Sequence, residues 1–119
     1  MARRMVNAGA GILINLTNDA WFLDSKEPYL HLQAAVFRAV ENRRDLIRAA
    51  NTGVSCFISS RGEIRSVLTA PDGDATYIEG AVVAPAVLSD EKTFYTRHGD
   101  LFVLFCAAFF VLGVIFLKE

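Results

Sequence analysis

A short apolar run that ends in polar and aromatic residues most constrains how this chain can fold. Residues 12–16 (Ile-Leu-Ile-Asn-Leu) contain β-branched side chains, follow a glycine and are too few for a helix, so they predict a buried β-strand. Asn18, Asp19 and Trp21 come soon after the run. Open α/β sheets place their ligand sites at the carboxyl ends of their strands. The sequence therefore predicts an α/β fold with its candidate site at this end of the strand.

The other elements of the first hundred residues are predicted from spacing and turn signals. Residues 1–8 are compatible with a short helix that the following glycines end. Apolar residues at helical spacing predict a longer helix over 29–43, packed on the sheet. Asn-Thr-Gly at 51–53 predicts a hairpin between the strands on either side of it. After the long helix, four strands are predicted, at residues 45–50, 54–59, 64–69 and 76–83.

The end of the chain is an uncharged apolar run. The chain is 53% hydrophobic, which is high for a soluble domain, and much of the excess lies in this run. As a helix, residues 101–117 measure ~25 Å at ~1.5 Å per residue, which is just enough for one membrane crossing. We therefore expect a domain over residues 1–100 and a transmembrane helix over residues 101–117.

Charge and composition exclude several classes of function. The net charge is -1, and the Lys and Arg residues are scattered in ones and twos, so the chain offers no basic patch to hold nucleic acid. Two cysteines are too few for a disulfide framework. His31 and His98 each stand alone, away from cysteine at metal-ligand spacing. We expect no nucleic acid, no metal and no cofactor.

Five residues are candidates to line a pocket: Asn18, Asp19, Trp21, Phe22 and His31. Asp19 has the best position for chemistry, although Asp and Asn in loops more often hydrogen-bond the backbone. Trp21 and Phe22 can form the wall of a lipid pocket, or they can be simple core residues. His31, early on the long helix, is either a partly buried helix residue with a hydrogen bond or a residue that contacts a ligand.

Several blocks of the sequence together resemble a known family. The chain is similar to the carboxyl-terminal part of bacterial apolipoprotein N-acyltransferases in the order and spacing of four blocks, at residues 13–22, 31–33, 38–44 and 48–55. The specific parts are Asn-Asp-Ala-Trp-Phe at 18–22 and Asn-Thr-Gly at 51–53. Residues 95–100, followed by one hydrophobic helix, are similar to the segment by which that family's domain rejoins the membrane.

The resemblance implies a fold, a reaction and a location. The fold is the second half of a nitrilase-like αββα sandwich (residues 1–100) followed by one transmembrane helix (101–117). The family transfers a fatty acyl chain from a phospholipid to the amino-terminal cysteine of a lipoprotein, through a thioester on an enzyme cysteine. The implied partners are a phospholipid donor, a lipoprotein acceptor and the membrane. The implied location is the bacterial inner membrane, with the globular part in the periplasm.

The resemblance assigns no catalytic residue to this chain. The family uses a Cys, a Glu and a Lys as activated thiolate, base and oxyanion-stabilising cation, and all three lie upstream of the 18–22 block, ahead of Met1. Cys56 follows the Asn-Thr-Gly turn, where the family nucleophile does not lie, so we interpret it as a small core residue. We expect no turnover from this chain alone.

The chain also departs from the family pattern at two positions. Leu23 and Arg43 stand where the family usually has glycine. If glycine serves a backbone turn with positive φ there, a larger residue adds strain of ~1 kcal/mol or more.

Two alternatives belong to other classes of protein. One is a soluble nitrilase-like amidase fragment, against which the uncharged run at 101–117 argues. The other is a non-catalytic, membrane-tethered interaction module that binds a partner through Trp21 and Phe22.

Overall fold

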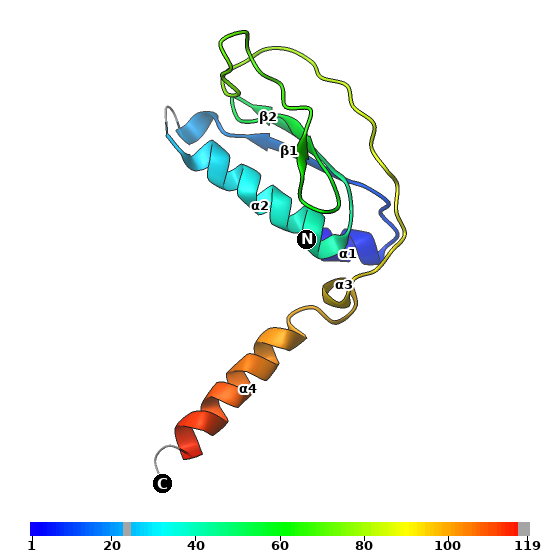
Figure 1. Cartoon of the computed structure of the whole chain (residues 1–119), viewed down its shortest axis with the longest axis vertical. Helices are drawn as coiled ribbons and strands as arrows, with labels where there is room; N and C mark the ends of the chain where they lie inside the picture. The colour runs from blue at the N-terminus through cyan, green and yellow to red at the C-terminus, as the bar shows by residue number, and fades with distance from the viewer. Residues whose placement is uncertain (23–24, 117–119) are drawn as a thin grey trace.

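The computed structural model describes residues 1–22 and 25–116. Four strands and a 3-10 helix alternate with four α-helices in the order α1 (Ala2–Asn7), β1 (Leu13–Asn18), η1 (Ala20–Phe22), α2 (Glu27–Asn42), β2 (Leu46–Asn51), β3 (Cys56–Ile58), β4 (Ile64–Arg65), α3 (Phe94–His98) and α4 (Leu101–Phe116). Helix α2 lies along one face of the sheet, and α4 extends away from the rest of the chain (Figure 1).

The four strands form one mixed sheet in the order β1-β2-β3-β4. Strands β1 and β2 run parallel, with Leu13 opposite Leu46 and Asn18 opposite Asn51. Helix α2 is the crossover that a parallel pair requires. Strand β3 pairs with β2 and with β4 in antiparallel fashion, which confirms the predicted hairpin around residues 51–53.

The core lies between the sheet and α2. Inward-facing side chains of the parallel strands pack with α2 and with Val6 of α1, in a buried cluster that includes Leu13, Leu46, Leu32, Ala35 and Ala39. Because side chains alternate along a strand, Ile14 and Leu16 point to the opposite face of the sheet, where they are exposed. This confirms an α/β fold with a helix layer on one face, while the full αββα sandwich stays a prediction.

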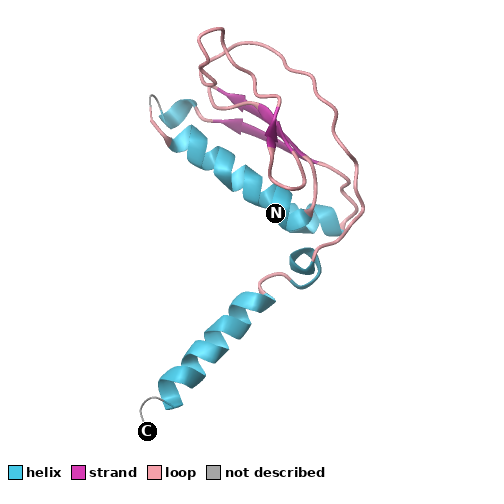
Figure 2. Ribbon diagram, in the orientation of Figure 1, coloured by secondary structure: helices cyan, strands magenta, loops and turns pink. Residues whose placement is uncertain are grey.

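Of the last two predicted strands, one is shorter than predicted and the other does not form. The strand expected at 64–69 ends after Arg65, because Ser66 has φ +46°, which an extended chain cannot adopt. The strand expected at 76–83 does not form; Tyr77 has φ +56° and donates its N–H to the carbonyl of Thr52 instead. Residues 66–93 therefore form a long irregular connection (Figure 2).

Arg43 ends α2 in the left-handed conformation, with φ 50° and ψ 50°. This is the position where the resemblance has glycine, so the hypothesis of a backbone turn with positive φ is confirmed here. The other such position, Leu23, lies outside the described residues.

The terminal helix α4 has 16 residues and carries no charge. At ~1.5 Å per residue it measures ~24 Å, against a hydrocarbon core of ~30 Å. Within residues 1–22 and 25–116, no helix is both long and apolar enough to cross a membrane. The structure therefore does not show the transmembrane helix expected over 101–117, of which residue 117 lies outside the described part.

Candidate functional site

Asp19 is the centre of a buried polar cluster at the carboxyl end of β1. Its side chain is 0% exposed, and its Oδ2 accepts a hydrogen bond from Arg48 at 2.8 Å. Its Oδ1 lies 2.9 Å from Nδ1 of His31 and accepts from Oγ1 of Thr17 at 3.2 Å. The cluster therefore joins β1, β2 and α2. The expectation that this carboxylate bonds the backbone is wrong, since three side chains hold it.

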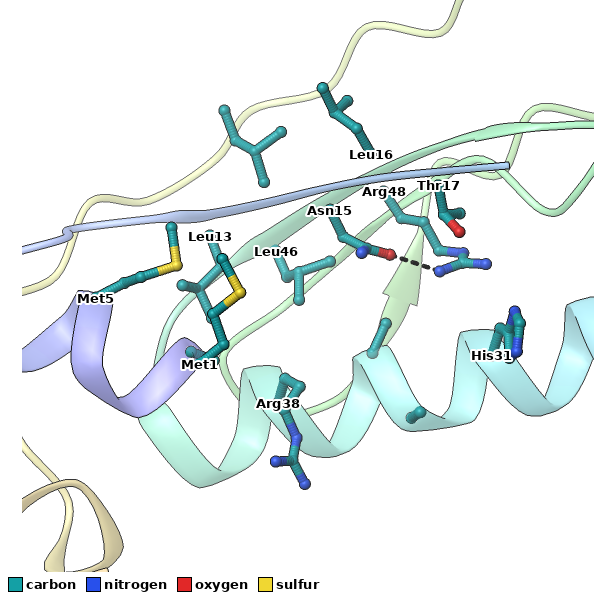
Figure 3. A pocket seen from close by; sticks show the side chains of 14 residues that line it. Met1, Met5, Leu13, Asn15, Leu16, Thr17, His31, Arg38, Leu46 and Arg48 are labelled. Atoms are coloured by element: carbon teal, nitrogen blue, oxygen red, sulfur yellow. Dashed lines mark hydrogen bonds between the residues drawn. The ribbon is translucent and has the colours of Figure 1, made fainter. Parts of the chain in front are cut away.

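Arg48 connects this carboxylate to two further segments. Its Nε donates to the carbonyl of Val54 at 3.1 Å, and another guanidinium nitrogen donates to Oδ1 of Asn15 (Figure 3). The parallel register places Asn15 directly opposite Arg48, with both side chains on the face of the sheet toward α2. Sequence reasoning missed Arg48 as a site residue. The available signal was a charged residue two positions after Leu46, on the inward face of its strand.

Gly53 allows the Asn-Thr-Gly turn to lie against Asp19. A Cβ atom at Gly53 would overlap the Asp19 carboxylate, and Ala50 lies close on another side. The block at 51–53 therefore needs glycine because of a close approach between two distant segments. This links the two blocks that carry the family resemblance.

His31 fits the first of the two alternatives that its sequence position left open, and its contact with a ligand stays a prediction. It lies on the first turns of α2 with its side chain 42% exposed, and its Nδ1 contacts Asp19. It also lines the pocket between α2 and β1 that is described below. The structure thus confirms a partly buried helix residue with a polar partner, and it places the same imidazole at a cavity.

The remaining candidates are Asn18, Trp21 and Phe22, at and just after the end of β1. Asn18 is exposed, and its Oδ1 accepts from the N–H of Ala20 at 3.1 Å and from Asn51 at 3.2 Å, which closes the turn after β1. Trp21 is 85% exposed, so it is not a core residue. The side chain of Phe22 lies outside the described part of the chain.

A pocket of about 600 Å³ lies between α2 and the outer edge of β1 (Figure 3). Strand β1 contributes five consecutive residues to its lining, so the pocket runs along the strand edge rather than under one face. The rest of the lining comes from α1, α2 and β2, namely Met1, Ala2, Met5, His31, Ala34, Ala35, Arg38, Leu46 and Arg48. Of the described candidates, His31 lines this pocket, whereas Asn18, Asp19 and Trp21 do not.

The cysteines lie apart from the pocket. Cys56 is 1% exposed within the core, which confirms its interpretation as a core residue. Burial raises the pKa of its thiol, and the nearby charge of Arg48 only partly opposes this. A nucleophilic cysteine needs the reverse, a lowered pKa and access to substrate. Cys106 is exposed on α4. The residues that the structure describes contain no group of three His, Cys, Asp or Glu side chains able to hold a metal ion.

Comparison of the sequence with known proteins shows which proteins this chain is similar to. The sequence model of the carbon-nitrogen hydrolase family matches residues 1–82. The apolipoprotein N-acyltransferase of Geobacter metallireducens is 44% identical over 108 residues, which are 91% of this chain and 20% of that protein. Apolipoprotein N-acyltransferase 1 of Treponema denticola is 40% identical over 111 residues, 92% of this chain and 19% of that protein.

A third relative extends the same pattern. The apolipoprotein N-acyltransferase of Rickettsia bellii is 35% identical over 109 residues, 92% of this chain and 21% of that protein. The chain therefore spans about a fifth of the length of the curated relatives that it matches. These findings confirm the resemblance to apolipoprotein N-acyltransferases that the four sequence blocks indicated.

Proposed function

Because this chain belongs to the carbon-nitrogen hydrolase family, we propose that it acts as the carboxyl-terminal part of an apolipoprotein N-acyltransferase. Such an enzyme transfers a fatty acyl chain from a phospholipid to the amino-terminal cysteine of a lipoprotein. The observation that carries the proposal is the extent of the match. Relatives with this name align over 108–111 residues, well beyond the 82 residues of the hydrolase domain.

We assign this chain a supporting role in that reaction. Acyl transfer through a thioester needs an activated thiolate, and a buried thiol with a raised pKa does not provide one at Cys56. What the described residues do provide is a rigid strand end, where Arg48 and Asp19 tie the 18–22 and 51–53 blocks together. These blocks would form one wall of the substrate site, with the reactive groups supplied by other parts of the enzyme.

We further propose that α4 enters the membrane, with residues 1–100 as one unit at the periplasmic surface of the bacterial inner membrane. Support comes from the composition and exposure of the helix. It has 16 uncharged residues and contributes none to the core. Large apolar side chains on all its faces are exposed, as in the four consecutive residues Phe102, Val103, Leu104 and Phe105. A helix that is apolar all round is typical of a lipid environment.

A chimaera tests the proposed function directly. The matching segment of the Geobacter metallireducens relative is replaced by this chain, and the transfer of a labelled acyl group to a lipopeptide is measured. We expect transfer to persist in the chimaera. A folded, membrane-extracted chimaera that retains its own thioester-forming cysteine but transfers nothing would contradict the proposal.

The 119-residue chain alone gives the complementary test. It is incubated with labelled phospholipid, and thioesters are sought by mass spectrometry of the intact chain. We expect none. An acylated Cys56 would show that its assignment as a core residue is incomplete and that this chain carries its own nucleophile.

One observation favours a second candidate, a membrane-tethered module that binds a protein partner. Trp21 is 85% exposed next to the strand end, and exposed tryptophans are typical of binding hot spots. A Trp21→Ala variant of the chimaera separates the two functions. Unchanged acyl transfer together with loss of a co-purifying partner would favour the interaction module.

A further inference from the structure

Helices α1, α2 and α3 are held together where α4 begins. Arg3 of α1 donates to three carbonyl groups of α3, and Asn7 donates to the carbonyl of Thr96 at 2.9 Å. On the other side, Oγ1 of Thr93 donates to the carbonyl of Glu41, one residue before the end of α2, at 2.6 Å. The root of α4 is therefore a fixed junction, from which the apolar helix projects (Figure 2).

Exposed basic residues stand on or next to each of the three helices that meet at this junction. Arg4 lies on α1, Arg43 at the end of α2, Lys92 just before α3, and Arg97 on α3. All four are exposed, and across the described ranges none of them takes part in an ion pair. We call these four residues the basic collar.

Two further cations at the same end, Arg3 and Arg44, have no carboxylate partner within the described part of the chain. The Arg3 guanidinium binds carbonyl oxygens of α3, and that of Arg44 binds carbonyl oxygens that include Ala10 at 2.8 Å. Glu41 is paired with Arg38 at 2.9 Å. Beside these six basic residues, the acidic residues on the segments at this end are Asp45, Asp90, Glu91 and Asp100, and the buried Asp45 carboxylate accepts from the N–H groups of Ser60 and Val87. This end is thus net positive, whereas the whole chain has a net charge of -1.

We propose that the basic collar binds the anionic head groups of the bilayer that α4 enters. This inference rests on the proposed insertion of α4. An apolar helix places the residues at its root at the level of the lipid head groups, and Lys or Arg there is attracted to anionic lipid. The exposed ring of Phe94, stacked on His98 with centroids 4.4 Å apart, adds apolar surface beside the collar.

Vesicle flotation tests the proposal with the whole chain. Protein in mild nonionic detergent is diluted onto vesicles of phosphatidylcholine alone, or of phosphatidylcholine with phosphatidylglycerol, at low and at 0.5 M salt. We expect binding to both, with tighter binding to the anionic vesicles at low salt. Each basic residue near the surface is expected to raise the affinity for anionic vesicles roughly fivefold. The Lys92→Gln/Arg97→Gln double variant should therefore reduce the preference for anionic over neutral vesicles on the order of 25-fold.

Lys26 provides a matched control for Lys92. Lys26 and Lys92 are both exposed, but Lys26 lies at the start of α2, at the opposite end of that 16-residue helix from the junction. Lys92→Gln should reduce the anionic gain about fivefold, and Lys26→Gln should leave it unchanged.

The outcomes distinguish the binding of lipid by the basic collar from the insertion of α4. Equal binding to neutral and anionic vesicles, or equal losses in the two lysine variants, would overturn the collar while leaving the insertion of α4 intact. Absence of binding to either kind of vesicle would overturn both.

Discussion

The buried pair between Arg48 and Asp19 gives the sharpest test of how the fold is held together. The two side chains are 2% and 0% exposed, with 2.8 Å between their charged atoms. Replacing Arg48 by Met removes the cation and leaves the Asp19 carboxylate fully buried, with only Thr17 and His31 as the remaining partners among the described residues. Removal of one partner from such a pair costs about 3–5 kcal/mol, because an uncompensated charge stays buried. We expect a loss of that size for Arg48→Met.

A surface pair of the same length is the control. Arg38 and Glu41 lie 2.9 Å apart, with side chains 49% and 28% exposed. Because solvent screens such a pair, Arg38→Met should cost only about 0.2–1 kcal/mol. The two variants delete the same kind of side chain at nearly the same separation. Because Arg48 also donates to Val54 and Asn15, the difference between them reports the buried pair together with these two hydrogen bonds.

Hydrogen exchange measures both losses in one experiment. The opening free energy of peptides from β1 and β2 is followed by mass spectrometry, with the chain in nonionic detergent. Arg48→Lys keeps the charge, and we expect an intermediate loss because an ammonium group lacks the fork that reaches Val54, Asn15 and Asp19 together. If Arg48→Met and Arg38→Met lower the opening free energy by the same amount, the Arg48–Asp19 pair is not desolvated and the reasoning is refuted.

Four further predictions concern Gly53, Arg43 and the two cysteines. Gly53→Ala should destabilise the sheet by about 1–3 kcal/mol in a urea titration, because the new methyl group displaces the Asp19 carboxylate; an unchanged midpoint would show that the contact is not close. Arg43→Gly should raise the thermal midpoint, since a left-handed residue other than glycine costs about 1 kcal/mol, and a lower midpoint would contradict this. Iodoacetamide should modify Cys106 but not Cys56 in the native chain. Burial raises the pKa of Cys56, so the native state keeps a proton that the unfolded state loses, and stability should fall as pH rises above about 8.5; a rise would reverse the sign.

Local pattern in the sequence was sufficient for the elements that position the site. The short apolar run at 12–16 predicted β1 through its length and its β-branched residues. The helical spacing at 29–43 predicted α2, because burial of one face imposes a period that the residues themselves show. The Asn-Thr-Gly turn at 51–53 predicted the hairpin for a different reason, because these residue types favour turns. The strands expected at 64–69 and 76–83 had the right composition, but positive φ at Ser66 and Tyr77 interrupts the extended chain. A positive φ cannot be predicted from the residue type at such positions, because the residues are not glycine.

The sequence by itself determined an α/β fold with a candidate site at the end of its first strand and an uncharged apolar segment at the end of the chain. Only the tertiary structure decided what the site consists of. Asp19 and Arg48 are 29 residues apart, and their pairing depends on the parallel register of β1 and β2 and on the missing side chain at Gly53. Periodicity reports which residues are buried, but it does not report which buried residues meet, because that depends on how separate elements pack.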